Sequence, residues 1–306
     1  MSELRFSIVI ACYNQEGFIR ETVESALSQS HPSKEIIVVD DCSCDGTADV
    51  LNTFGSSIIL ARLPINSGVY AARNHGASLA RGEYLVFLDG DDVFMPWTLD
   101  VYDRLITDRC PKLILGRAII FHGNVPEVKM CDIPRNIQFV EYADFLSKDR
   151  PGLFNTSALV VNHTTFWSVG GWSHGIFYQD IQDLLTKLEE SGKMILVLAP
   201  GTVWYRMHLT NAVRKILPFI DGIRVLLAKA RTGLYPGGRE RWVARSAWFG
   251  GLIFYWAKEA IRAKLYRDGF ILLISGWWMI LFAVIRRGLT LLMGRNPIEL
   301  LPLKHD

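Results

Sequence analysis

Short runs of apolar residues alternate with amphipathic stretches through the first 92 residues of the chain, and this alternation limits the folds open to it. The apolar runs are Phe6–Ala11, Ile36–Val39, Ile58–Leu63 and Tyr84–Leu88. Continuous apolar runs of this length are typical of strands that are buried on both faces of a sheet. Helical stretches between them predict parallel strands joined by right-handed crossovers, which is a doubly wound α/β fold.

The helices expected between these strands are Glu16–Gln29, a helix that begins at Ala48, and Val69–Ala80. Asn14 stands where a side chain can cap the first of them. Beyond Asp92 the pattern is weaker, because prolines interrupt mixed segments. There the sequence predicts strands at Ala158–Asn162 and Met194–Leu198 and helices at Thr164–Val169 and Asp180–Ser191.

The fourth strand leads directly into an acidic turn that contains Asp89, Asp91 and Asp92. Open α/β sheets bind ligands beyond the carboxyl ends of their strands. Carboxylates this close repel one another, and a divalent cation would share their charge. The turn therefore predicts a metal-bound diphosphate as the ligand. A solvated acidic loop is the alternative that this motif alone leaves open.

Composition excludes several classes of protein. Half of the 306 residues are apolar, which is enough for one large core and a smaller second unit. The net charge is only +2, and no basic run interleaved with aromatic residues is found in the first two thirds, so we expect no nucleic-acid partner. Five irregularly spaced cysteines favour neither a disulfide framework nor a zinc site. Met1–Arg5 lacks the features of a secretory signal, so we expect a cytoplasmic protein.

Four motifs occur in an order that is similar to the inverting nucleotide-sugar glycosyltransferases of family 2. They are Ile8–Asn14, Val38–Thr47, Asn66-Ser67-Gly68 with Ala72-Arg73-Asn74, and Leu88–Asp92. Weaker similarity continues through Gly170-Gly171-Trp172, Gln179-Asp180 and Tyr205-Arg206-Met207-His208. The resemblance implies a GT-A fold, a Rossmann-like domain that binds nucleotide-diphosphate sugars.

The resemblance also implies roles for the acidic turn. Asp91 would hold Mg²⁺ or Mn²⁺ against the donor diphosphate, and Asp89 would reach the ribose. Asp92 and His208 are further candidate metal ligands. The departing nucleoside diphosphate gains negative charge, which a bound cation stabilises without proton transfer.

Contacts to the nucleotide sugar are implied along the same edge of the sheet. There an aspartate can accept the imide hydrogen of a uracil-like base or bind ribose hydroxyls. A turn-forming role for Asp41 and a surface ion pair for Arg73 remain alternatives, and Trp172 could either stack on an acceptor or pack in the core. The implied donor contacts are Ala11, Tyr13, Asp40, Asp41, Arg73, Asp89 and Arg206.

Transfer with inversion requires a base that takes the proton of the attacking acceptor hydroxyl. In the family this base is the aspartate of a Glu-Asp pair that begins a helix, and the matching pair here is Gln179-Asp180. Asp180 is thus the predicted base and Asp183 the fallback. Gln179 departs from the family pattern and removes a neighbouring negative charge. Helix capping is the alternative role for Asp180.

The similarity fades beyond residue 215, where long apolar stretches follow. Ser246–Ala257 is rich in aromatic residues, and the 17 residues of Gly269–Ile285 carry no charge, which is near the lower limit for crossing a bilayer. Basic residues flank both stretches, which favours peripheral or in-plane attachment to an anionic membrane surface. A membrane-spanning segment and a soluble helical cap or dimer face remain alternatives.

We therefore expect a GT-A domain in residues 1–215, with a nucleotide-binding half (1–92) and an acceptor half (93–215), and a helical, membrane-associated region in residues 216–306. The expected function is metal-dependent, inverting transfer of a sugar from a UDP- or GDP-type donor to a glycan or lipid-linked acceptor. Surface polysaccharide or glycolipid synthesis at the cytosolic face of the membrane is the expected setting. A catalytically silent nucleotide-sugar-binding or scaffold protein and a nucleotidyltransferase are the alternatives.

Overall fold

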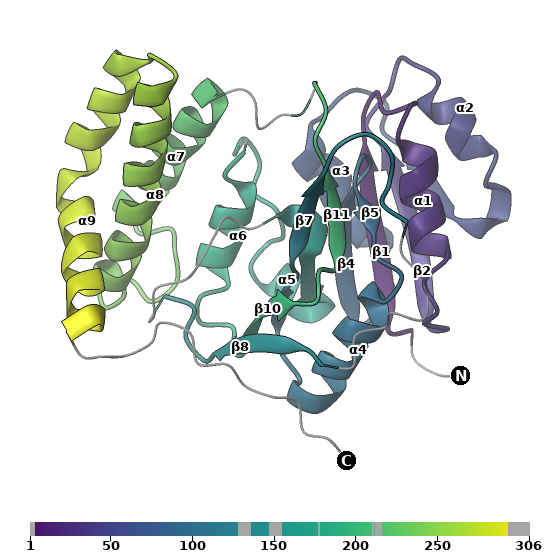
Figure 1. Ribbon diagram of the computed structural model, residues 1–306, viewed down its shortest axis with the longest axis horizontal. Coiled ribbons are helices and arrows are strands. Elements are labelled where there is room, and N and C mark those ends of the chain that lie inside the picture. The colour runs from purple at the N-terminus through teal and green to yellow at the C-terminus, as the bar shows by residue number, and fades with distance from the viewer. Residues whose placement is uncertain are drawn as a thin grey trace.

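The computed structural model describes residues 4–127, 136–146, 155–176, 178–209, 211 and 216–292. A mixed sheet of eight strands forms its centre, with helices on both faces and a group of three helices beside it (Figure 1). The strand order is β3-β2-β1-β4-β9-β6-β10-β8, and a small second sheet has the order β5-β11-β7. The strands are β1 (Phe6–Cys12), β2 (Lys34–Asp40), β3 (Ile59–Arg62), β4 (Tyr84–Asp89), β5 (Val93–Phe94), β6 (Leu113–Leu115), β7 (Ala118–Phe121), β8 (Gln138–Tyr142), β9 (Leu159–Asn162), β10 (Met194–Ala199) and β11 (Val203–Arg206).

Six helices belong to the sheet domain and three form the group beside it. The helices are α1 (Ile19–Leu27), α2 (Thr47–Asn52), α3 (Val69–Leu79), α4 (Thr98–Arg109), α5 (His163–Ser168), α6 (Asp180–Lys187), α7 (Ile216–Arg231), α8 (Trp242–Arg262) and α9 (Tyr266–Leu292).

Alternate residues of the central strands enter two different cores. In β1, Ile8 and Ile10 belong to a core with α1 and α4, while Val9 and Ala11 belong to a core with α3 and α6. Successive side chains of a strand point to opposite faces, so a strand that is apolar at every position is buried on both. This is why β1 and β4 are continuous apolar runs rather than alternating ones.

The prediction of parallel strands is correct for β3, β2, β1 and β4. The sequence predicted no strand direction beyond residue 92, and there β9 lies antiparallel to both β4 and β6, and β8 lies antiparallel to β10. The predicted cap at Asn14 is wrong. Asn14 adopts a φ of 51°, and its side chain accepts a hydrogen bond from Cys44 N–H at 2.8 Å. Helix α1 instead begins at Ile19, after Phe18.

The helices α7, α8 and α9 share their own apolar core. Helices α8 and α9 approach closely because Gly250 has no side chain: a Cβ there would lie 2.0 Å from the carbonyl oxygen of Met279. Helix α9 contains Tyr266–Leu289, the single segment within the described ranges that is long and apolar enough to cross a membrane. The predicted apolar stretches thus form a packed helical hairpin.

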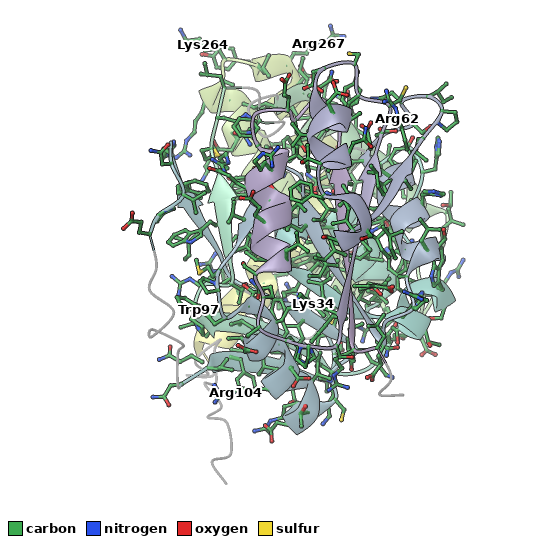
Figure 2. The ribbon with its side chains drawn as sticks, turned by 90° about the vertical axis from the view of Figure 1, so that its right-hand side faces the viewer. Lys34, Arg62, Trp97, Arg104, Lys264 and Arg267 are labelled. Atoms are coloured by element: carbon green, nitrogen blue, oxygen red, sulfur yellow. The ribbon has the colours of Figure 1, made fainter. Side chains whose placement is uncertain are left out.

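The turn between α8 and α9 lies at the same end of the molecule as the carboxyl ends of the parallel strands. Figure 2 shows Lys264 and Arg267 of this turn toward that end, together with Arg62 at the end of β3, while Lys34 at the start of β2 lies toward the opposite end. The active edge of the sheet and this basic turn therefore face the same way.

Candidate active site

The carboxyl ends of β1, β2 and β4 meet at one edge of the sheet. Cys12 pairs in register with Asp40, and Ala11 with Asp89. The acidic turn after β4 crosses directly over the end of β1, where Gly90 N–H donates to the carbonyl oxygen of Ala11 at 3.1 Å. The predicted donor residues on these three strands are therefore neighbours.

Gly90 allows the acidic turn to lie against this edge. A Cβ at this position would lie 2.0 Å from Oε1 of Gln15 and 2.7 Å from Cβ of Cys12. The Thr22 hydroxyl also donates to the Gly90 carbonyl at 2.9 Å. The turn is consequently held between β1 and α1, which fixes the directions of the aspartates on either side of Gly90.

Asp92 is completely buried and anchors the turn from inside. The Ser157 hydroxyl and Arg206 N–H donate to its carboxylate at 2.5 Å and 3.0 Å. Burial and the charges of Asp91 and Asp89 raise the pKa of Asp92 well above its usual value. Of the two carboxylates predicted as metal ligands, Asp92 therefore faces the interior and Asp91 the open edge.

Asp91 meets His208 across the site. His208 Nε2 lies 2.9 Å from Oδ2 of Asp91, and its ring stacks on Phe18 with the centroids 4.6 Å apart. No group of three or more potential ligand side chains is found in the described part of the chain. One carboxylate and one imidazole nonetheless fit a Mg²⁺ or Mn²⁺ ion that takes its remaining ligands from substrate phosphates and water, as Mg²⁺ sites commonly do.

Arg206 holds the acidic turn that carries Asp91. Its Nε donates to the Asp91 carbonyl at 2.9 Å, and another guanidinium nitrogen lies 2.5 Å from Oε2 of Glu21. The guanidinium also lies over the ring of Phe121, 4.8 Å from its centroid. Arg206 is 5% exposed, and these contacts hold the turn and α1 together, while its contact with the donor stays a prediction.

Arg73 connects the donor edge to the opposite wall of the site. Its guanidinium donates to Asp89 at 2.5 Å and to Asp180, and it lies over the ring of Trp172, 5.1 Å from the centroid. Burial alone would lower the pKa of Arg73, but the two carboxylates outweigh it and raise this pKa. Arg73 is thus a buried cation shared by two acids, not a surface ion pair.

Asp180 and Asp183 have different surroundings although both lie in the first turn of α6. Asp180 contacts Arg73 and borders the site, with 12% of its side chain exposed. Asp183 is fully buried, where Tyr235 Oη donates to it at 2.8 Å and Lys229 donates as well. The residue before α6, Gln179, is buried and makes no side-chain cap. The geometry therefore favours Asp180 over Asp183 as the base.

Asp40 and Asp41 lie side by side but are used differently. Both oxygens of Asp41 accept from the turn at Ser67 N–H and Gly68 N–H, at 2.7 Å and 2.8 Å. Asp40 accepts from Ser43 N–H at 2.9 Å through Oδ1, while its buried Oδ2 forms an ion pair with Arg62, whose Nε lies 3.4 Å away. Of the two aspartates, Asp40 is therefore the one whose second oxygen still has lone pairs for a nucleotide base.

Ala11 and Tyr13 occupy the two sides of this edge. Ala11 is 5% exposed beneath the turn, and Tyr13 is 44% exposed, at the open surface.

The sequence analysis did not identify Ser157 or Tyr205 as part of the site. Ser157 Oγ also accepts from Asp89 N–H at 3.1 Å, and burial together with the charges of the acidic turn raises the pKa of Tyr205. Tyr205 belongs to the motif Tyr205-Arg206-Met207-His208, which could have indicated it, whereas no local sequence pattern distinguishes Ser157.

Trp172 belongs to the core and does not line the open site. It is 2% exposed and packs edge-on against Phe87, with 5.1 Å between centroids. Its backbone exchanges hydrogen bonds with the Asn74 side chain at 2.9 Å in both directions. Of the two roles left open for Trp172, the structure favours packing, since the ring supports Arg73 from behind.

An α/β sheet with an acidic turn at its carboxyl edge and a carboxylate at the start of a facing helix defines a GT-A type of transferase fold. Solved structures agree: S. aureus TarS 1-349 in complex with UDP-GlcNAc matches with a TM-score of 0.62 at 16% identity, covering 82% of this chain and 72% of that one. The complex of the same protein with UDP gives a TM-score of 0.61 at 17% identity, with 82% and 71% covered.

Residues 7–156 match the family model described as "Glycosyl transferase family 2". TuaG of Bacillus subtilis, named for teichuronic acid biosynthesis, is 34% identical over 44% of this chain and 54% of its own length. WfaP of Escherichia coli, a UDP-Glc:alpha-D-GlcNAc-diphosphoundecaprenol beta-1,3-glucosyltransferase by name, is 44% identical over 29% of this chain and 36% of its own. Residues 7–156 therefore form a glycosyltransferase family 2 domain, and the chain spans about half or less of these curated relatives.

Proposed function

We propose that the protein is a metal-dependent, inverting glycosyltransferase that moves a sugar from a nucleotide-diphosphate donor to a glycan or lipid-linked acceptor. The observation that carries this proposal is the bridge made by Arg73, which joins Asp89 on the donor side to Asp180 on the other wall. A donor-binding carboxylate and a candidate base thus face a common space at a sheet edge where ligands bind.

The donor would lie across the carboxyl ends of β1, β2 and β4. Asp40 would accept a hydrogen bond from the base through Oδ2, which also faces the Arg62 guanidinium at 3.4 Å, and Asp89 would bind the ribose. Asp91 and His208 would hold Mg²⁺ or Mn²⁺, which when bound stabilises negative charge on the diphosphate. Arg206 keeps the acidic turn in place, since it donates to the carbonyl of Asp91.

Asp180 would take the proton from the acceptor hydroxyl as that oxygen attacks the sugar. Arg73 fixes the direction of the Asp180 carboxylate, and Trp172 beneath the guanidinium limits the movement of Arg73. A general base must lie within hydrogen-bond reach of the proton that it removes. The fixed direction of the Asp180 carboxylate would hold it in reach of the acceptor hydroxyl.

The setting that we propose is surface polysaccharide or glycolipid synthesis at the cytosolic face of a membrane. The names of TuaG and WfaP support it, as does that of a poly(ribitol-phosphate) beta-glucosyltransferase from Bacillus spizizenii that is 29% identical over 53% of this chain. Helix α9 would provide the attachment, because large apolar side chains remain exposed along it.

Nucleotide release from a donor panel tests the proposal. The purified protein would be incubated with UDP-glucose, UDP-GlcNAc, GDP-mannose and CDP- and dTDP-sugars and with detergent-solubilised lipid extract as the acceptor, with and without Mn²⁺, beside Asp91→Asn and Asp180→Asn. We expect metal-dependent release from one donor, and its loss in both variants. Binding of UDP without turnover of any donor would favour a silent binding protein, and release of pyrophosphate from a nucleoside triphosphate would favour a nucleotidyltransferase.

A further inference from the structure

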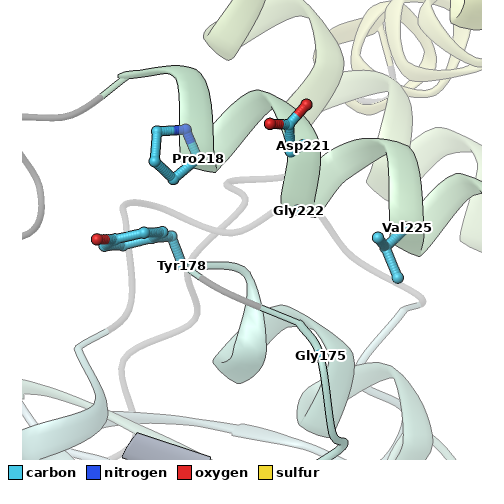
Figure 3. Close-up of a pocket in the computed structure, with 6 residues that line it drawn as sticks. All are labelled: Gly175, Tyr178, Pro218, Asp221, Gly222 and Val225. Carbon is cyan, nitrogen blue, oxygen red and sulfur yellow. The ribbon is translucent and has the colours of Figure 1, made fainter. Parts of the chain in front are cut away.

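A pocket of 280 Å³ lies between the segment that precedes α6 and one face of α7. Figure 3 shows the Tyr178 ring next to Pro218, with Val225 further along α7. The four lining residues of α7 are spaced by three, one and three positions, so they belong to a single face of that helix. The residues that line the pocket are Gly175, Tyr178, Pro218, Asp221, Gly222 and Val225.

The pocket adjoins the candidate base. Tyr178 precedes Asp180 by two residues, so their Cα atoms lie at most about 7 Å apart. Tyr178 adopts a φ of 61°, and its ring packs on Phe219 with 4.8 Å between centroids. A group bound beside this ring would therefore lie against the segment that carries Asp180, the acid that we assign to deprotonation of the acceptor.

The lining has the chemistry of a sugar-binding site. An aromatic ring offers an apolar surface to the C–H face of a pyranose, and small binding sites combine such surfaces with a few polar groups. Asp221 at the rim accepts from Arg224 at 2.8 Å, and a carboxylate with one such partner still has lone pairs for hydroxyl groups. The negative charge of Asp221 disfavours a phosphate in the same place.

We propose that this pocket binds a pyranose unit of the acceptor, with Tyr178 as the stacking surface and Asp221 as the acceptor of hydroxyl hydrogen bonds. The proposal rests on the proposed function, since it gives the acceptor a place beside Asp180. It adds that α7, which belongs to the C-terminal helical group, takes part in the choice of acceptor.

Val225→Trp would fill the pocket, and Leu217→Trp is its matched control. Both positions are apolar, partly exposed and on α7, but only Val225 lines the pocket. The probes are methyl α-D-glucopyranoside and methyl N-acetyl-β-D-glucosaminide, whose binding to the full-length protein would be followed by saturation-transfer NMR. We expect binding to the wild type and to Leu217→Trp, and at least a fivefold weaker signal with Val225→Trp, Tyr178→Ala and Asp221→Asn.

Binding of UDP, measured on the same samples, separates this inference from the proposed function. Unchanged UDP binding together with a lost sugar signal in Val225→Trp would support the subsite. An unchanged sugar signal in Val225→Trp, or no signal with either glycoside on the wild type, would overturn it. Failure of the wild type to bind UDP would count against the proposed function while leaving the sugar measurement valid.

Discussion

Arg73 on α3 donates a hydrogen bond to the carboxylate of Asp180, which lies 107 positions further along the chain at the start of α6. The same guanidinium pairs with Asp89 at 2.5 Å. A planar guanidinium has donors in a fixed fork and can serve two carboxylates at once, which a lysine ammonium does with much less directional control. The carboxyl end of β4 and the start of α6 are therefore joined through one side chain.

Asp180→Asn should abolish most of the transfer without loss of donor binding. The amide cannot take a proton, and general bases contribute on the order of 10²- to 10⁴-fold to the rate. We expect kcat to fall within that range while the dissociation constant for UDP stays unchanged, as measured by calorimetry. Asp180→Glu, which keeps a carboxylate, should retain more activity than the amide variant. Equal kcat in wild type and Asp180→Asn would remove Asp180 as the base.

His208→Ala should weaken the metal dependence of donor binding. His208 is the partner of Asp91 at 2.9 Å, so its loss removes one of two proposed protein ligands. Loss of groups that support a metal site commonly costs about 10- to 100-fold in metal affinity, and we expect at least the lower value. The readout is UDP binding titrated with Mn²⁺. His163→Ala, at the start of α5, where the ring lies 3.1 Å from the Gly82 carbonyl before the amino end of β4, should leave the titration unchanged.

Gly90→Ala should destabilise the protein and disturb the acidic turn. The added Cβ would lie 2.7 Å from Cβ of Cys12, closer than real Cβ atoms come, so β1 or the turn must shift, and the Gln15 side chain, with Oε1 only 2.0 Å away, must rotate. Overpacking of this kind costs about 1–3 kcal/mol. Thermal unfolding would measure the loss. Gly251→Ala on α8 is the matched control, because no atom lies within 4 Å of its added Cβ. Equal melting temperatures for the two variants would contradict the packing argument.

The first half of the fold could be predicted because its signals are local. Strand β4 and helix α3 are each marked by their own hydrophobic pattern, and the turn at Asn66-Ser67-Gly68 by its residue types. The antiparallel placement of β9 could not be predicted in this way. Its four residues pair with β4 and β6, which lie far away in the sequence, and nothing in a short apolar run specifies the direction of its partners.

The candidate site shows the same limit. The motifs placed Asp89, Asp91 and Asp180 at strand and helix ends and favoured Asp91 as the metal ligand, but they left Asp92 as a further candidate and could not predict its burial. That difference depends on Ser157, which donates to Asp92 from 65 positions away and has no local motif. The burial of Asp183 likewise depends on Tyr235 and Lys229, which belong to the C-terminal third of the chain. Contacts between residues far apart in the sequence therefore determine that Asp91 and Asp180 border the site while Asp92 and Asp183 are buried.

Glu35 should make stability depend on pH through contacts between β2 and the strands beside it. Burial alone would raise its pKa, but hydrogen bonds from Ser7 and Arg81 outweigh burial and lower it. A lowered folded-state pKa means that the stabilisation is present above the unfolded value of 4.5 and is lost as pH falls through the folded value. Urea unfolding at pH 7 and pH 3.5 should show a smaller pH-dependent loss for Glu35→Gln than for the wild type. An equal loss would assign the acid sensitivity to other groups.

Helix α9 should bind anionic membranes through one face. Phe270 and Trp277 are each 63% exposed, and with the other exposed residues of α9 they form a stripe at spacings of three and four positions. Basic residues at Lys264 and Arg267 begin the helix on the side that the active edge faces. Trp277→Glu should reduce co-sedimentation with phosphatidylglycerol vesicles at least about tenfold, since it would place a charge in the apolar face. Ile120→Glu, at a site 62% exposed on β7, is the matched control and should bind as the wild type does.

If both variants bound vesicles equally well, the exposed apolar stripe of α9 would need a protein partner to cover it instead. Sedimentation velocity would then show whether that partner is a second copy of the chain.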